Sequence, residues 1–452
     1  METKLAGIAR VAKERPQEKF TSLAHLINAE TLMQCHFEMK GNKASGVDQV
    51  TKEEYESNLD ENLQDLVSRM KRQAYRPQPT RRTYIPKPGS DKKRPLGIPA
   101  YEDKLVQAAL AEILSAIYEQ EFLNSSFGFR PNRGCYDALR VLNKIVIKGN
   151  INYIVDVDIK GFFDHVNHEW LIKFLEHRIS DPNIIRLVKR FLKAGIMEEG
   201  KRYETAEGTP QGGLASPILS NIYLHYVIDL WFEKKVRKQC KGDAFMVRYA
   251  DDNVFCFQYE QEAKHFYQLL QERLGKFGLE ISLEKSKIIP FGRNIWKKYK
   301  DEKDDENKPG SGRVTKPETF DFLGFTHYCS QSLNGKFRVK RKTSRKKYQA
   351  SLLRCKLWIQ ANRHMPISLL MEELRLTLQG YYRYYGVTDN SEMPRKFLDE
   401  VKKYLFKNLN RRSQRRSCNW NKFTLLFKKY PLPSPRIYVN IFELRAHIGY
   451  IK

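Results

Sequence analysis

"FMVRYADDNVFCF", residues 245–257, places two adjacent aspartates between two short apolar runs. Carboxylates repel one another and lose hydration beside apolar strands, so this pairing is energetically unfavourable unless a ligand or a structural role compensates for it. One interpretation is a polar hairpin turn at Ala250–Asn253 whose carboxylates cap backbone N–H groups. The other is a divalent-metal site, because Mg²⁺ is bound by one or two carboxylates together with substrate phosphates. A metal site predicts a further carboxylate on a neighbouring strand.

Two aspartates are candidates for that further carboxylate. In "YIVDVDIKGFFDHVNH", which starts at Tyr153, Asp156 and Asp158 share the polar face of a predicted strand. They lie roughly 6–7 Å apart along it, so spacing alone does not choose between them. The Gly/Pro-rich loop of "GTPQGGLASPILSNIYL", residues 208–224, precedes an apolar helix and would bring backbone N–H groups and Gln211 close to a ligand.

The composition of the whole chain indicates a nucleic-acid partner. Its 452 residues allow two or three domains, and 80 Lys and Arg against 53 Asp and Glu give a net charge of +27. Residues 401–452 hold thirteen Lys or Arg against Glu443 alone, and they interleave with aromatic residues. Such clusters neutralise phosphates while aromatic faces stack on unpaired bases. The seven cysteines form no C-x-x-C pair, which argues against zinc sites, and no apolar run is long enough to predict a membrane span.

The secondary-structure pattern is mixed. We expect helices in the first 75 residues around a loop at 41–50, extended or hairpin structure at 76–94, a helix at 103–122, a strand at 152–159, a mobile charged loop at 297–317, and basic helices from about 340 onward.

Several motifs occur in an order that identifies a family resemblance. Asp158 with Phe163, P-Q-G at 210–212, Y-A-D-D at 249–252, "GLEISLEKSKI" at 278–288 and "FLGF" at 322–325 resemble the palm motifs of reverse transcriptases. The resemblance is closest to group II intron reverse transcriptase/maturases. "RRTYIPKPGSDKKRPLGIPAYEDKLVQAAL" from Arg81 and "SSFGFRPNRGCYDAL" from Ser125 look like that family's fingers, and "LQGYYRYYGV" from Leu378 looks like its thumb.

The resemblance implies an α+β fold, a right-hand polymerase with a helical thumb and maturase domain. It implies an N-terminal extension over residues 1–75, fingers and palm over 76–330 with the 297–317 insertion, and a thumb and maturase (X) domain over 335–452. The chain shows no paired cysteines or H-N-H cluster after "YPLPSPRI", which predicts a form without an HNH endonuclease domain.

The resemblance also implies residue roles. It selects Asp158 over Asp156, so that Asp158, Asp251 and Asp252 would hold two Mg²⁺ ions (or Mn²⁺), with Lys285 as a further catalytic residue. Phe163 would lie beneath the incoming sugar and exclude a 2′-hydroxyl. The other expected ligand-binding residues are Arg81, Lys87, Arg130 and Gln211 for the nucleotide, and Arg411, Arg412, Arg415 and Arg416 for RNA.

The implied function is Mg²⁺-dependent, RNA-directed DNA polymerisation, joined to binding and splicing of a group II intron RNA and to its retrohoming. The expected partners are the intron RNA, an RNA template with a DNA primer, target DNA and dNTPs, with no membrane, in the cytoplasm or nucleoid of a bacterium. Two alternatives remain open at this point. One is an RNA-splicing cofactor with incidental polymerase activity, and the other is a domesticated relative acting in DNA repair or defence.

Overall fold

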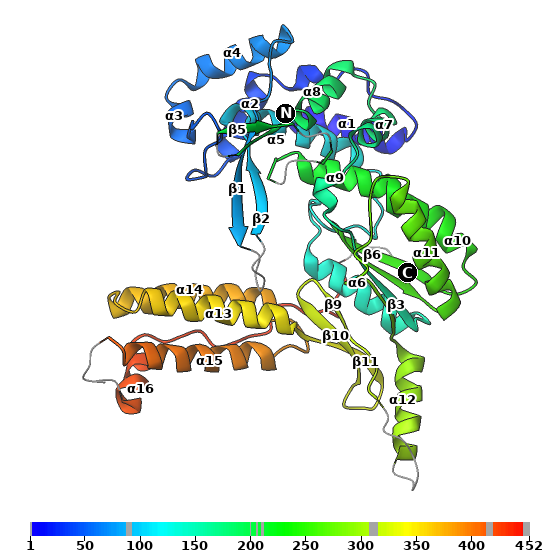
Figure 1. The fold of residues 1–452 in the computed structure, drawn as a ribbon, viewed down its shortest axis with the longest axis vertical. Coiled ribbons are helices and arrows are strands. Elements are labelled where there is room, and N and C mark those ends of the chain that lie inside the picture. The colour runs from blue at the N-terminus through cyan, green and yellow to red at the C-terminus, as the bar shows by residue number, and fades with distance from the viewer. Residues whose placement is uncertain are drawn as a thin grey trace.

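The protein folds into an upper body, a central sheet and a lower helical arm (Figure 1). This computed structural model describes residues 2–86, 93–198, 200–204, 207–208, 212–306, 315–412 and 419–445. Helices and three separate sheets occur together, so the expected α+β class is confirmed. No helix in the described ranges is long and apolar enough to cross a membrane.

The upper body combines helices with a four-stranded sheet of order β2-β1-β4-β5. The predicted loop at 41–50 is free of helix, and the proline-punctuated segment after residue 76 forms the predicted antiparallel hairpin. Its elements are α1 (Glu2–Glu14), α2 (Ala29–Glu38), α3 (Lys52–Glu56), α4 (Leu59–Lys71), β1 (Thr80–Pro86), β2 (Lys93–Ile98), α5 (Tyr101–Tyr118), α7 (His168–Glu176), α8 (Pro182–Leu192), β4 (Ile196–Glu198) and β5 (Lys201–Tyr203).

The central sheet has the order β6-β7-β3-β8 and is antiparallel throughout. The predicted strand at 152–159 is therefore an inner strand, which explains its run of apolar residues. The sheet and its helices are β3 (Tyr153–Asp158), β6 (Ala244–Tyr249), β7 (Asp252–Phe257), β8 (Lys287–Pro290), α6 (Cys135–Lys148), α9 (Ser216–Leu224), the π-helical turns η3 (His225–Asp229) and η4 (Phe232–Val236), α10 (Arg237–Gln239) and α11 (Glu260–Gly275).

Two apolar cores lie on either side of this sheet. One includes Val155, Phe255 and Phe257 with α5, α7, α9 and α11, and the other includes Ile154, Val254 and Cys256 with α6 and the helices of the lower arm. Because successive residues of a strand face opposite sides, each inner strand contributes to both cores. The ends of β3 and β7 are held firmly as a result.

The lower arm begins with a three-stranded sheet of order β11-β10-β9 and continues in stacked helices (Figure 1). Its elements are α12 (Arg293–Glu306), β9 (Phe320–Phe322), β10 (Phe325–Gln331), β11 (Phe337–Thr343), α13 (Arg345–Ala361), α14 (Ile367–Tyr385), α15 (Glu392–Leu409) and α16 (Trp420–Lys429).

The expected loop at 297–317 is wrong for its first ten residues, which belong to α12. The charges there are compatible with a helix because Lys298 and Glu302 pair at i,i+4, at 3.7 Å. Tyr299 is buried and packs against Trp296, so this helix also has an apolar anchor. Residues 307–314 lie outside the described ranges.

Candidate active site

The three aspartates selected from the sequence meet where β3 and β7 end. Asp158 is the last residue of β3 and is the direct cross-strand partner of Asp252, the first residue of β7. Directly opposed residues have Cβ atoms about 5 Å apart. Asp251 precedes Asp252 in the tight turn between β6 and β7. The carboxylates therefore lie at one end of the two inner strands, although Asp158 is almost a hundred residues from the other two.

The turn that carries Asp251 is tightly specified by its neighbours. Ala250 has a φ of +56°, in the left-handed region that favours glycine. Gly128 lies against it, and a Cβ on Gly128 would be 2.3 Å from the backbone nitrogen of Ala250. A side chain at position 128 would displace the turn. The "SSFGF" segment thus abuts the aspartates directly.

A buried arginine supports the turn from beneath. Arg248 is fully buried, and its Nε and Nη2 atoms donate to the two carboxylate oxygens of Asp229 at 2.7 and 2.5 Å. Its Nη1 atom donates to the carbonyl oxygen of Ala250 at 3.0 Å and to Oδ1 of Asn221 at 2.9 Å. Asn221 in turn donates to the carbonyl oxygen of Gly128 at 2.8 Å. One guanidinium therefore ties both sides of the turn to η3 and α9.

Sequence reasoning missed this network. No role is assigned to Arg248 from the sequence, although a charged residue between Val247 and Tyr249 in an apolar run signals a buried ion pair. Burial alone would raise the pKa of the Asp229 carboxyl, but Arg248, together with His225 at 3.8 Å, outweighs it and holds that pKa below its ordinary value.

The carboxylates at the turn are electrostatically crowded. Lost hydration, followed by repulsion from Asp251 and Asp158, raises the pKa of Asp252 to about 6. Lost hydration and Asp158 also raise the pKa of Asp251. A cation placed among these groups would remove the repulsion.

Cationic side chains already surround the aspartates. Lys285 donates from Nζ to Oδ2 of Asp158 at 2.6 Å. The turn bearing Lys285 is fixed to β3, because Ser282 N donates to the carbonyl oxygen of Asp158 at 2.8 Å. Arg94 of β2 and Lys347 of α13 were not singled out from the sequence, yet their charges favour ionised Asp251 and Asp252 respectively. The β1–β2 hairpin, the segment before β8 and α13 thus all contribute charge to one site.

The donor chemistry fits Mg²⁺ or Mn²⁺. Hard divalent cations prefer carboxylate oxygens, and Mg²⁺ takes only one or two from the protein while keeping waters or substrate phosphates. In the described part of the chain, no group of three or more His, Cys, Asp and Glu side chains, these three aspartates included, is placed to hold a metal ion by itself. An open set at Asp158, Asp251 and Asp252 suits ions that are shared with a phosphate-bearing substrate. Their role as metal ligands stays a prediction.

Asp156 lies deeper than Asp158. Its neighbours in the register are Val254 on β7 and Lys287 on β8, whereas Asp158 is opposed to Asp252. Lost hydration, followed by repulsion from Asp252, raises the pKa of Asp156 to about 7. The position of Asp158 at the strand end supports its selection over Asp156.

Phe163 and its neighbour differ in burial. Phe162 is 2% exposed and packs against Tyr223, whereas Phe163 is only partly buried, with its ring 5.3 Å from that of Phe162. Phe163 therefore has a surface to offer a ligand and Phe162 does not. The predicted sugar-excluding role of Phe163 is compatible with this placement.

Arg81 and Arg130, the two arginines predicted to bind the nucleotide, make hydrogen bonds and ion pairs within the protein itself. Arg81 donates from Nε and Nη2 to the carbonyl oxygen of Ser45 at 3.0 and 2.6 Å. Arg130 is 7% exposed, pairs with Glu119 at 3.0 Å and donates to backbone carbonyls, including that of Ser126. In this arrangement Arg130 stabilises the segment before Gly128. A nucleotide-binding role for either arginine stays a prediction, and Lys87 and Gln211 lie outside the described residues.

Two of the four predicted RNA-binding arginines are described. Arg411 is exposed after α15, whereas Arg412 donates to the carbonyl oxygen of Met365 at 2.6 Å and so ties this end of α15 to the α13–α14 connection. Arg411 is therefore the better placed of the two to meet a phosphate. Arg415 and Arg416 lie outside the described residues.

Comparison with known proteins gives the family. Residues 85–327, more than half of the chain, match the family model described as reverse transcriptase (RNA-dependent DNA polymerase). The group II intron-encoded protein LtrA of Lactococcus lactis subsp. cremoris is 38% identical over 222 residues, which are 49% of this chain and 37% of LtrA. Protein YkfC of Escherichia coli K12 is 33% identical over 282 residues, covering 55% of this chain and 73% of YkfC. The mitochondrial nuclear intron maturase 2 of Arabidopsis thaliana is 26% identical over 183 residues, covering 30% of this chain and 24% of the maturase.

These matches confirm the resemblance to group II intron-encoded proteins that the sequence motifs predicted, and with it the right-hand polymerase fold. The matched stretch spans little more than a third of LtrA. The match therefore does not transfer the activities of the whole LtrA protein to this chain. The match to the family model includes the motifs that carry Asp158, Asp251 and Asp252. The chain belongs to the reverse transcriptase (RNA-dependent DNA polymerase) family.

Proposed function

We propose that the protein is an RNA-directed DNA polymerase that also binds a group II intron RNA and assists its splicing and retrohoming. The observation that supports polymerase activity is the strand register, which places Asp158 opposite Asp252, with Asp251 in the adjoining turn. A substrate phosphate with its metal ions would complete the crowded carboxylate site. The similarity to LtrA and to an intron maturase supports the intron RNA as partner.

The chemistry is an in-line attack of a primer 3′-oxygen on the α-phosphorus of a dNTP. Two bound Mg²⁺ ions would lower the barrier by activating the attacking oxygen and stabilising the leaving pyrophosphate. Asp158, Asp251 and Asp252 would hold the ions. Lys285 neutralises Asp158 in the free protein and would turn to a phosphate once a divalent ion takes its place. Phe163 would define the sugar position.

Primer extension tests this proposal. A long RNA annealed to a DNA oligonucleotide should be copied when dNTPs and Mg²⁺ are present, and EDTA should stop the reaction. A DNA oligonucleotide without template controls for terminal addition. No template-dependent extension with either Mg²⁺ or Mn²⁺ would contradict the polymerase assignment.

Phe163→Val should weaken sugar discrimination. Removing the ring opens the space in which a 2′-hydroxyl would otherwise clash, so ribonucleotide incorporation should rise by about tenfold or more, the effect of roughly 1.4 kcal/mol, while DNA synthesis continues. Single-nucleotide kcat/KM values for a dNTP and its rNTP measure this. Phe37→Val, at a ring 63% exposed on α2, is the matched control and should leave the ratio unchanged. An unaltered ratio in Phe163→Val would assign the gate to another residue.

The splicing role is tested separately. Purified protein should bind its intron RNA and raise the splicing rate at Mg²⁺ concentrations at which the RNA alone is slow. The proposal includes the RNA template with its primer and the target DNA as further partners, and a cytoplasmic location. Tight binding of unrelated structured RNA with the same affinity would contradict an intron-specific role.

A further inference from the structure

A concentrated basic surface lies on α8 in the upper body, away from the central sheet that carries the aspartates (Figure 1). A cavity of about 430 Å³ lies between α8, the segment that precedes β1, and β5. Six of its nine lining residues are cationic, and none is acidic. We call this set the α8 basic surface: Arg76, Arg186, Lys189, Arg190, Lys193 and Arg202.

These cations have no acidic partners in the part of the chain that is described. None of the six takes part in an ion pair with a described carboxylate. Arg190 instead donates to the carbonyl oxygens of Tyr75 and Gln73 at 2.8 and 3.1 Å, and Arg76 donates to that of Gln73 at 2.8 Å. Lost hydration and the nearby charges of Arg76 and Arg186 lower the pKa of Arg190. The cluster is self-repulsive, and an external anion would relieve that repulsion.

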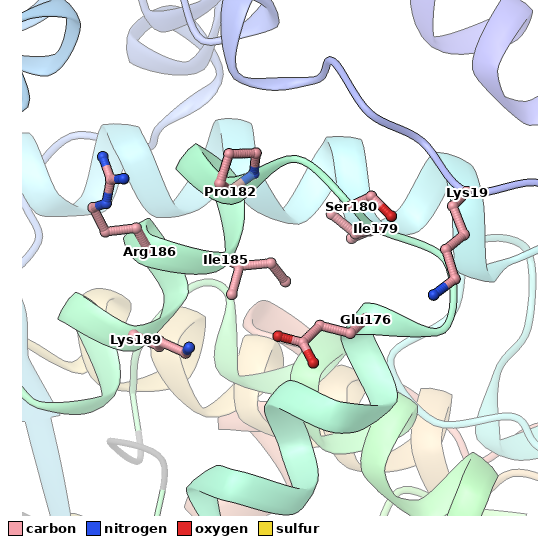
Figure 2. Close-up of a pocket in the computed structure, with 8 residues that line it drawn as sticks. All are labelled: Lys19, Glu176, Ile179, Ser180, Pro182, Ile185, Arg186 and Lys189. Carbon is pink, nitrogen blue, oxygen red and sulfur yellow. The ribbon is translucent and has the colours of Figure 1, made fainter.

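The surface continues into a neighbouring pocket of about 590 Å³. Arg186 and Lys189 line both cavities, and Lys19 adds a cation on the far side (Figure 2). Lys189 points toward Glu176, the one acid in this second pocket. Glu176 therefore marks the edge of the cationic surface, which extends from there along α8 toward Lys193 and Arg202.

The lining chemistry distinguishes among nucleic acids. Sites for unpaired strands place aromatic rings where bases can stack. The α8 cavity has only Pro77, Pro79 and Ala194 as apolar lining and no aromatic ring, so it offers contacts to phosphates but no platform for bases. Paired RNA presents its phosphates outward and is recognised chiefly by shape and backbone. The cavity therefore fits the backbone of a helix better than a single strand.

We infer that the α8 basic surface binds the phosphate backbone of a paired RNA segment, at a position separate from the polymerase site. This inference rests on the proposed RNA-binding function. α8 packs on α7 in the upper body, whereas the aspartates lie on the central sheet (Figure 1). The surface would hold a structured part of a bound RNA while the template occupies the active site.

Charge removal on α8 tests the inference. Arg186→Gln, Lys189→Gln and Lys193→Gln together leave Arg190 and its contacts with the backbone intact. The triple variant of the full chain should bind a blunt RNA duplex about tenfold or more weakly at physiological ionic strength. The slope of log affinity against log salt should flatten by about two to three, since each phosphate contact contributes about 0.9. Extension of a short oligonucleotide template–primer should be unchanged.

A matched variant removes three exposed lysines from η4 and α10, which are not part of the α8 basic surface: Lys234→Gln, Lys235→Gln and Lys238→Gln. It should keep the wild-type affinity and salt slope for the RNA duplex. Equal loss in both variants, or no loss in the α8 variant, would overturn the inference, as would a loss confined to a DNA duplex of the same sequence. A chain without polymerase activity but with this difference between variants would contradict the proposed function and leave the α8 surface supported.

Discussion

The Asp251→Asn, Asp252→Asn double variant is expected to lose DNA synthesis while keeping its fold. Asparagine preserves size and much of the hydrogen bonding but removes two charges from the metal ligands. Metal ions contribute several kcal/mol to such transition states, and each 1.4 kcal/mol is a factor of ten, so the rate of primer extension should fall by about three orders of magnitude or more. Intron RNA binding, which we propose rests on basic surfaces elsewhere, should be retained.

A measurement of thermal stability distinguishes loss of DNA synthesis at the active site from loss caused by unfolding. In the absence of metal, the ionised forms of Asp251 and Asp252 are costly, because lost hydration and nearby carboxylates (Asp158 for both, and Asp251 for Asp252) raise their pKa values. Neutralising them should leave the thermal midpoint equal to that of the wild type or higher. A control that removes two adjacent exposed acids from α4, Asp60→Asn with Glu61→Gln, should keep full polymerase activity. Near wild-type synthesis by the Asp251, Asp252 variant would refute the metal assignment, and loss of splicing by the folded variant would show that both functions share this site.

Periodicity predicted the strands around the aspartates, but not which carboxylates meet. Asp156 and Asp158 occupy the same face of β3, so alternation treats them alike. The choice depends on the register with β7, which opposes Asp158 to Asp252 and Asp156 to Val254. Register is a property of long-range pairing, and only the family motifs carried that information in the sequence.

The charge pattern of the sequence predicts a loop where the structure has a helix, and it does not identify Asp229 as the ion-pair partner of the buried Arg248. The run of Lys, Asp and Glu after residue 296 predicts a loop, yet the i,i+4 ion pair of Lys298 with Glu302 and the buried Tyr299 stabilise its first part as a helix. Arg248 was overlooked because its partner Asp229 lies 19 residues away, at the end of a helical turn, where no local pattern joins them. The sequence alone does not distinguish a charged residue on the surface from one in the core, because burial depends on the tertiary fold.

Arg248 should be required both for stability and, through the turn, for polymerisation. Arg248→Met leaves Asp229 buried without its ion-pair partner, and removing one member of a buried pair costs about 3–5 kcal/mol. The lowered pKa of Asp229 in the wild-type fold means that this pair stabilises above the unfolded carboxyl's pKa and that its contribution is lost as the pH falls below it. In Arg248→Met the buried Asp229 carboxyl keeps, among the described residues, only His225, whose Nδ1 atom lies 3.8 Å away, and should instead favour its protonated form, so stability should fall as the pH rises. Denaturant unfolding at several pH values measures the pH dependence of stability in the wild type and in Arg248→Met, which should have opposite signs.

A second variant separates positioning from stability. In Arg248→Met with Asp229→Leu both charges are gone, and replacing a buried pair by apolar side chains is often neutral or stabilising. The unfolding free energy should therefore recover, yet the bonds from Arg248 to Ala250 and Asn221 are still missing. If those bonds position the aspartates, kcat for primer extension should stay low and the Mg²⁺ concentration for half-maximal activity should stay high. Arg375→Met, which breaks an exposed pair with Glu372, should change stability by no more than about 1 kcal/mol and leave activity intact. Full recovery of kcat together with stability would limit Arg248 to a structural role, because the turn would then hold its carboxylates in place without that guanidinium.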